Sequence, residues 1–204
     1  FARGGSGTLL EEIEIVAFLE SLKQQYKAIN DVPIIAAQPV GVLADPILLG
    51  NAVLNIVENA KYWATRNSRQ EPGEVRILVA VVDDMALVKV RDNGPGVSDH
   101  LLVMDALMQR PKLFNLSETD RDDGTGLGLN EAWYSLRDMG GDVGISTSTD
   151  PQDSWTEFSV SVRRVASAEN RVFAEASSIL VNLFTGRLAW FNTCMRVVLF
   201  PLTV

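Results

Sequence analysis

The chain of 204 residues is 47% hydrophobic and 22% charged, which is typical of a soluble globular protein with one sizeable domain, alone or with an appendage. A formal net charge of −8 argues against nucleic acid as the main partner. The single cysteine, Cys194, excludes an internal disulfide and favours a reducing compartment, so we expect a cytoplasmic location. The start of the chain shows no secretory leader and lacks a methionine, which fits a fragment of a longer, partly cytosolic protein.

The first part of the chain predicts two helices with a short strand between them. Apolar residues recur at helical spacing over residues 9–29, and a short apolar run follows over 32–37. Asp45 and Pro46 are a strong start for the second helix, because aspartate caps the first turn and proline suits the first helical position. We expect this helix to run to about residue 66, where its apolar face ends.

The second part predicts a hairpin, a long loop, a third helix and two closing strands. Runs of β-branched residues favour strands over 75–82 and 86–91, joined by a turn. Residues 97–123 are polar and aperiodic, which indicates a long loop with room for one short helix, and such loops are usually functional. Helical spacing over 127–139 ends at two glycines, and we expect the closing strands over 143–148 and 155–163.

The end of the chain differs in composition from the rest. No acidic residue follows Glu175, and the last stretch is rich in apolar and aromatic residues. Polar residues interrupt it too often for a membrane span, so we expect none in this chain. We therefore divide the chain into a domain over 8–164 and an apolar extension over 165–204, which is an extra packing helix, a partner-docking segment or a non-native extension.

Asparagines recur every fourth residue on the second predicted helix. Asn51, Asn55 and Asn59 share one face and form a polar ladder beside the apolar side. Magnesium prefers oxygen ligands, keeps several waters and takes few protein contacts when it binds with phosphates. An asparagine carbonyl suits that task and adds no charge near a phosphate. The alternative is a solvated polar stripe on a surface helix.

A carboxylate and two glycines follow the hairpin. Asp92 shares a strand face with Val88 and Val90, which is the face expected to be buried. A buried carboxylate needs a donor, and the exocyclic amine of adenine is one, whereas guanine offers a carbonyl at that position. Gly94 and Gly96 let the backbone turn sharply and approach a ligand. The alternative is an ordinary surface turn.

The third predicted helix opens with alternate glycines. Gly124, Gly126 and Gly128 lie where backbone N–H groups and the helix dipole favour an anion. The stretch does not fit the dinucleotide fingerprint, because Leu129 stands in the place of its third glycine, and it has no Lys-Ser/Thr pair of a P-loop. The alternative is a flexible hinge without a ligand. In this order, the asparagine helix, the carboxylate turn and the glycine stretch together outline a nucleotide pocket.

At these residues the chain resembles the ATP-binding catalytic domain of sensor histidine kinases, whose superfamily includes DNA gyrase, a heat-shock chaperone and a mismatch-repair protein. Residues 55–60 are similar to the family's asparagine box, 92–97 to its first glycine box and 124–129 to its second. The glycines at 140–141 and the Thr-Glu-Phe at 156–158 are similar to the ends of its last helix and last strand. The resemblance covers about residues 8–163.

The resemblance implies an α+β fold, a two-layer α/β sandwich of the Bergerat type with a mixed sheet packed on helices. ATP would bind between the asparagine helix and the loop over 97–123, with Mg²⁺ as the second cofactor. Asn55 and Asn59 would be the catalytic residues, with Asn59 as the magnesium ligand and Asn55 at the phosphates, while Asp92 would read adenine. The further cofactor-binding residues that it implies are Gly94, Gly96, Gly124, Thr125, Gly126, Leu127, Gly128, Leu129 and Thr156.

The resemblance also implies an activity and partners. The chain would be a protein-histidine kinase that passes the γ-phosphoryl group of ATP to a phosphoacceptor histidine domain, in the same or another chain, and from there to a response regulator. His100, the only histidine, does not lie in an acceptor signature, and we interpret it as a surface loop residue.

Some positions depart from the family pattern. Phe114 is the only residue that resembles the family's phenylalanine-rich box, Lys61 stands one place before the usual basic residue, and the glycine usual before the last strand is missing. Two alternatives remain. One is a stand-alone ATPase or serine kinase of the superfamily, such as an anti-sigma factor, which the Gly-Leu-Gly-Leu form disfavours. The other is an ATP-binding docking module without catalysis.

Overall fold

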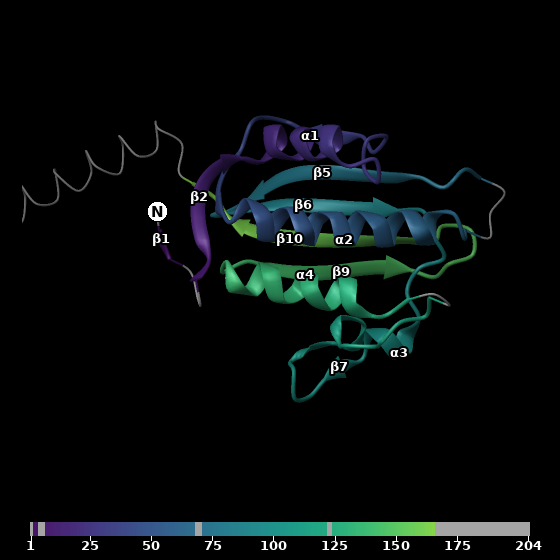
Figure 1. Cartoon of the computed structure of the whole chain (residues 1–204). Coiled ribbons are helices and arrows are strands. Elements are labelled where there is room, and N and C mark those ends of the chain that lie inside the picture. The colour runs from purple at the N-terminus through teal and green to yellow at the C-terminus, as the bar shows by residue number, and fades with distance from the viewer. Residues whose placement is uncertain (1, 4–6, 68–70, 122–123, 166–204) are drawn as a thin grey trace, which may run out of the picture. The chain divides into compact units, whose positions relative to one another are not determined.

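The computed structural model describes residues 2–3, 7–67, 71–121 and 124–165, in which a five-stranded mixed sheet packs on helices (Figure 1). The sheet order is β3-β5-β6-β10-β9, with β3 parallel to β5 and every other pair antiparallel. The strands are β3 (Ile34–Ala36), β5 (Val75–Val82), β6 (Met85–Asp92), β9 (Asp142–Ser148) and β10 (Trp155–Arg163). The predicted α+β fold, a mixed sheet packed on helices, is confirmed.

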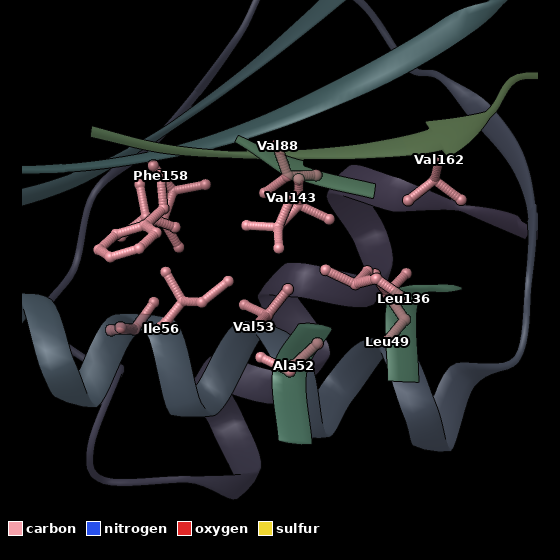
Figure 2. Close-up of a cluster of buried hydrophobic side chains, with 14 of the residues drawn as sticks. Leu49, Ala52, Val53, Ile56, Val88, Leu136, Val143, Phe158 and Val162 are labelled. Atoms are coloured by element: carbon pink, nitrogen blue, oxygen red, sulfur yellow. The ribbon is translucent and has the colours of Figure 1, made fainter. Parts of the chain in front are cut away.

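The core lies between this sheet and two neighbouring helices, α2 (Pro46–Ala64) and α4 (Leu127–Asp138). Figure 2 shows apolar side chains of α2 and α4 facing those of the sheet. The labelled residues among them are fully or almost fully buried: Leu49, Ala52, Val53, Ile56, Val88, Leu136, Val143, Phe158 and Val162. Fully burying one large aliphatic or aromatic side chain stabilises a fold by roughly 1.5–3 kcal/mol, so this layer fixes the position of α2.

The predicted helix over residues 9–29 is wrong at both ends. Residues Leu9–Glu14 form strand β2, which pairs antiparallel with β4 (Gly41–Ala44) in a small sheet that also contains β1 (Ala2–Arg3). The helix α1 covers only Ile15–Gln25. Apolar residues spaced as on a helix occur in β2 as well, and pairing with the distant β4 decides its structure.

Glu14 marks the change from strand to helix. Its carboxylate accepts hydrogen bonds from the backbone N–H groups of Val16 at 3.0 Å, Ala17 at 2.7 Å and Val40 at 3.0 Å. Burial acts to raise the pKa of Glu14, but these N–H groups outweigh it and hold that pKa below its usual range. One side chain therefore caps α1 and ties it to the segment before β4.

The remaining predicted elements agree closely with the structure. Asp45 caps α2 by accepting from the N–H groups of Ile47 and Leu48, as the Asp-Pro pair predicts. The α2 helix ends at Ala64, the hairpin strands β5 and β6 lie where expected, and α4 ends one residue before the predicted limit. Strand β4 has no counterpart among the predicted elements.

The loop predicted over 97–123 contains more structure than one short helix. It has α3 (Asp99–Leu102), a small hairpin of β7 (Met104–Asp105) and β8 (Arg110–Pro111), and the 3₁₀ turn η2 (Lys112–Phe114). Phe114 is buried and packs edge to face on Phe158, with ring centroids 6.3 Å apart. This contact anchors the loop to the core of the sheet.

The predicted apolar extension, apart from Val165, lies outside the described residues. The division of the chain into residues 8–164 and 165–204 therefore stays a prediction. Among the helices in the described part of the chain, none is both long and apolar enough to cross a membrane.

Candidate functional site

A polar pocket of about 180 Å³ brings together the asparagine helix and the glycine stretch. Asn55 and Asn59 line it from α2, and five residues line it from the segment that leads into α4 and from its first turn: Gly124, Thr125, Gly126, Gly128 and Leu129. Asn51 is exposed and lies outside the pocket, so the predicted polar ladder contributes two of its three members.

The glycines of this pocket have steric reasons to be there. Gly126 caps α4 with a φ of +68°, and a Cβ at this position would lie 2.7 Å from the backbone of Ser117. A Cβ at Gly128 would lie 3.4 Å from Asn55 Oδ1, so this glycine lets α4 approach α2 closely. The helix has no side-chain cap at Gly126, which leaves its first turn suited to an anion.

One residue of the glycine stretch, Leu127, lies differently from its neighbours. Leu127 is 43% exposed and does not line the pocket. Its N–H group donates to the Thr125 hydroxyl at 3.3 Å. The Leu127 side chain therefore faces away from the polar pocket that its neighbours line.

An apolar pocket of about 310 Å³ adjoins the polar one. Both are lined by Asn59 and Leu129, and the apolar pocket adds Trp63 from α2 and Phe158 from β10. Gly96 lines it with a φ of +84°, and a Cβ there would lie 2.9 Å from the Thr149 side chain. The two pockets form one continuous candidate site with a polar end and an apolar end.

Trp63 was missed in the sequence, although a signal for it exists. It follows Asn59 by four residues, as Asn59 follows Asn55, so the three share one face of α2. Phe158 was also missed as a site residue, and only the pairing of β10 with β6 brings it here.

Asp92 is only 2% exposed and lines neither of these two pockets. Oδ1 accepts a hydrogen bond of 2.9 Å from the Gly94 N–H, and Oδ2 has no hydrogen-bond partner among the described residues. Burial raises the pKa of Asp92 to about 7, although the backbone N–H groups of Gly94 and Thr156 and the charge of Arg91 act to lower it. The structure thus holds a buried carboxyl group with one oxygen still to be satisfied.

The neighbours of Asp92 fix it in this place. A Cβ at Gly94 would lie 2.7 Å from Asp92 Oδ1 and 2.9 Å from the Trp63 carbonyl oxygen, so only glycine fits between them. Thr156 pairs with Asp92 across the sheet and is buried, and Phe158, two residues further on β10, lines the apolar pocket. Asp92 therefore shares the inner face of the sheet with the wall of that pocket.

A third cleft, of about 820 Å³, lies where β5 and β10 begin and β6 ends. Asp92 and Asn93 line it, but Asn55, Asn59 and the glycines of the two glycine motifs do not. Lys61 lines this cleft and forms an ion pair with Asp31. We place the candidate site in the two smaller pockets, because they unite the asparagine pair with Gly96 and the glycine stretch. Of the other predicted site residues, Asp92 lines only the third cleft, and Gly94, Leu127 and Thr156 line none of the three.

The polar pocket carries hard oxygen donors. Besides the asparagine amides it is lined by Glu58 and Glu118. Within the described ranges, no group of three or more His, Cys, Asp or Glu side chains could hold a metal on its own. This donor set suits Mg²⁺ that brings phosphate and water ligands with it.

His100 belongs to neither pocket. Its side chain is 65% exposed, and its Nε2 atom lies 3.3 Å from Asp120 Oδ1. This position agrees with the interpretation of His100 as a surface residue.

Solved structures of histidine kinases share this fold. The mycobacterial sensor histidine kinase MprB is 23% identical, with a TM-score of 0.59 over 76% of this chain and 98% of that one. The catalytic domain of the histidine kinase ThkA is 18% identical, with a TM-score of 0.61 over 78% and 100%. Full-length ShkA, solved in complex with AMPPNP, is 23% identical, with a TM-score of 0.58 over 78% and 32%. This domain thus shares the fold of histidine kinase catalytic domains.

The sequence identifies the family. The chain belongs to the histidine kinase-, DNA gyrase B- and HSP90-like ATPases, because the model of that family matches residues 44–166. It is 25% identical over 145 residues to the signal transduction histidine-protein kinase AfsQ2 of Streptomyces coelicolor, covering 70% of this chain and 25% of that protein. It is 26% identical over 134 residues to sporulation kinase D of Bacillus subtilis, covering 66% and 24%. The chain thus spans about a quarter of the length of these relatives.

Proposed function

We propose that this chain is the catalytic part of a protein-histidine kinase, which binds Mg-ATP and transfers its γ-phosphoryl group to a histidine on a separate domain. The observation that carries this proposal is that one helix, α2, presents Asn55, Asn59 and Trp63 to two adjoining pockets, one polar and one apolar. ATP has the same division into a triphosphate and a base. Membership of the ATPase family supports the assignment.

The base belongs in the apolar pocket. Trp63 and Phe158 supply flat apolar surface there. Asp92 is on the same face of the sheet as Phe158, and its Oδ2 has no hydrogen-bond partner among the described residues, so a base that reaches it would meet an open acceptor. The exocyclic amine of adenine donates a hydrogen bond, whereas guanine has a carbonyl at that position and would leave Asp92 unsatisfied. Thr156, buried next to Asp92, is the further base-side residue that we assign.

The triphosphate belongs in the polar pocket. Backbone N–H groups of the glycine stretch and the first turn of α4 would bind phosphate oxygens, and Asn55 would lie beside them. The amide oxygen of Asn59 would hold the metal. Mg²⁺ held there would supply positive charge that offsets the charge developing on the phosphates during transfer.

The acceptor comes from outside this domain. In the transfer the bond between the γ-phosphorus and the bridging oxygen breaks, a phosphorus–nitrogen bond to imidazole forms, and ADP and the imidazole proton leave. His100 lies outside both pockets and pairs with Asp120, so it is not placed to accept. We assign the acceptor to a histidine domain in the same protein or a partner, which passes the phosphoryl group to a response regulator in two-component signalling.

Calorimetric titration tests the nucleotide half of this proposal. The full chain is titrated with Mg-ATP and with Mg-GTP, and the Asp92→Asn variant with Mg-ATP. We expect binding of ATP, no binding of GTP, and a large loss of ATP affinity in the variant, because an amide cannot offer the same acceptor. If the folded protein does not bind Mg-ATP, the proposal is wrong.

Phosphotransfer tests the kinase half. The chain is mixed with labelled Mg-ATP and a supplied phosphoacceptor domain, and label on the acceptor histidine is measured. Phosphate release without an acceptor would favour a stand-alone ATPase, and nucleotide binding with neither reaction would favour a docking module.

A further inference from the structure

The polar pocket has little positive charge of its own. Two carboxylates, of Glu58 and Glu118, line it, and Arg121 is the only lysine or arginine among its described lining residues. Lys61 is on α2 but lies off the face of Asn55 and Asn59, and its ammonium group pairs with Asp31 instead. Among the described residues that line this pocket, a triphosphate would therefore meet one cationic side chain.

Arg121 is held at both its backbone and its side chain. Its N–H donates to the Thr119 hydroxyl at 3.1 Å, and its carbonyl accepts from the Gly124 N–H at 3.1 Å. Its guanidinium carbon lies 3.9 Å from the centre of the Tyr62 ring, in a cation–π contact. The backbone bonds fix Arg121 to the glycine stretch, and the ring directs its guanidinium toward α2.

Tyr62 lies on the same side of α2 as the two asparagines of the pocket. It follows Asn59 by three residues and Asn55 by seven, so all three lie along the same side of the helix. Arg66 also stacks on this ring, at 3.5 Å, but it is exposed, lies outside the pocket and donates to the Tyr62 carbonyl. Of the two stacked arginines, Arg121 alone faces the site.

We propose that Tyr62 is a positioning residue that holds the Arg121 guanidinium beside the asparagine pair, where this guanidinium binds the triphosphate of the nucleotide. The proposal rests on the proposed function, since it describes the phosphate end of the same site. Arg121 supplies a planar donor group for phosphate oxygens, and stacking on a ring lowers the entropy lost when it binds. Tyr62 thus acts on the ligand through Arg121.

The test compares Mg-ATP with adenosine, which lacks phosphates, by calorimetric titration of the full chain. We expect Arg121→Gln to weaken Mg-ATP binding about 10- to 100-fold and to leave adenosine binding unchanged. Tyr62→Leu should weaken Mg-ATP binding about 2- to 5-fold, also without an effect on adenosine, because only the stacking contact is lost. Tyr62→Phe, which keeps the ring, should restore the wild-type affinity.

Two further variants separate positioning from a structural role. Arg66→Gln removes the same charge beside the same ring but outside the pocket, and should leave Mg-ATP binding unchanged. The double variant of Tyr62→Leu and Arg121→Gln should bind no more weakly than Arg121→Gln alone, because the ring acts through the guanidinium. Circular dichroism checks that every variant is folded.

Several results would overturn the proposal. One is an equal loss of adenosine and Mg-ATP binding in Tyr62→Leu, which would mean that the ring only supports the fold. Another is additive losses in the double variant, and a third is wild-type Mg-ATP affinity in Arg121→Gln. If the wild-type chain binds neither adenosine nor Mg-ATP, the proposed function itself fails, and this inference fails with it.

Discussion

The backbone N–H of Gly94 donates a 2.9 Å hydrogen bond to Asp92 Oδ1, and the other carboxyl oxygen, Oδ2, has no partner among the described residues. Only glycine fits at position 94, since a Cβ would lie 2.7 Å from that carboxyl oxygen. The turn therefore holds a half-satisfied acid inside the sheet. An arrangement of this kind is costly without a ligand, because a buried charged oxygen lacks compensation.

The first prediction concerns stability against pH. Burial raises the pKa of Asp92 to about 7 in the folded chain, from its ordinary value of 3.8, so the folded state binds the proton more tightly than the unfolded state. The contribution of Asp92 to the free energy of unfolding is fully present below its ordinary pKa of 3.8 and is lost as pH rises through about 7. Urea unfolding of wild type and Asp92→Asn should be measured from pH 4 to 8. The variant should gain stability relative to wild type as pH rises to about 7, with no further gain above pH 7. A pH-independent difference would contradict the buried acid.

The second prediction concerns the pH dependence of binding. In the proposed complex the adenine amine would donate to the ionised form of Asp92, so binding should release a proton wherever the free site is protonated. We expect the Mg-ATP affinity to fall as pH drops below about 7, the raised pKa of Asp92. Titrations at pH 6.5 in buffers of different ionisation enthalpy measure the proton release. Asp92→Asn abolishes the release if Asp92 is its source.

The third prediction uses two glycines with similar backbone angles. Gly96 has a φ of +84° and Gly140 a φ of +77°, but a Cβ would be crowded by Ser148 and Thr149 only at Gly96. Gly140→Ala should therefore cost only the strain of the left-handed backbone, about 1–2 kcal/mol. Gly96→Ala should lower the free energy of unfolding by roughly a further 1–3 kcal/mol through overpacking, and should also weaken nucleotide binding.

Urea unfolding of the two glycine variants checks the third prediction. Equal losses of stability in Gly96→Ala and Gly140→Ala would show that the loop after β6 moves aside easily. In that case the wall of the apolar pocket would be soft.

The fourth prediction concerns the metal. Asn59→Ala should weaken ATP binding about tenfold or more in the presence of Mg²⁺, because the proposed ligand to the metal is lost. When a chelator removes the metal, the variant and the wild type should bind ATP with the same affinity. Asn51→Ala is the matched control, because Asn51 lies on the same helix but is exposed and outside the pocket. A loss that persists without Mg²⁺ would assign Asn59 to the nucleotide alone.

Local sequence patterns located the elements that position the site. The Asp45 cap, the asparagines of α2 and the β-branched strands of the hairpin are encoded within a few residues of each other, so the predicted positions agree with the structure. The stretch Leu9–Glu14 was misread as helix because its apolar spacing fits a helix, while its pairing with β4 depends on residues far along the chain. Helical periodicity alone does not exclude a strand whose partner is distant.

The same distinction applies to the site. The asparagines and glycines were identified from motifs, and Trp63 could have been, since it continues the spacing of Asn55 and Asn59. The contact between Arg121 and Tyr62 could not, because it depends on how the loop returns to α2. Side-chain meetings between distant segments follow from the packed fold, which no local pattern encodes.

The order of strands in the sheet predicts that its central strands and the hairpin of β7 and β8 open on different timescales. Strands β6 and β10, which carry Asp92, Thr156 and Phe158, each have a neighbour on both sides, so their amide protons should be among the last to exchange with solvent. The hairpin of β7 and β8 projects Leu107 with 92% of its surface exposed, and its amides should exchange early. The outer hairpin should therefore open and close many times within the lifetime of one folded sheet.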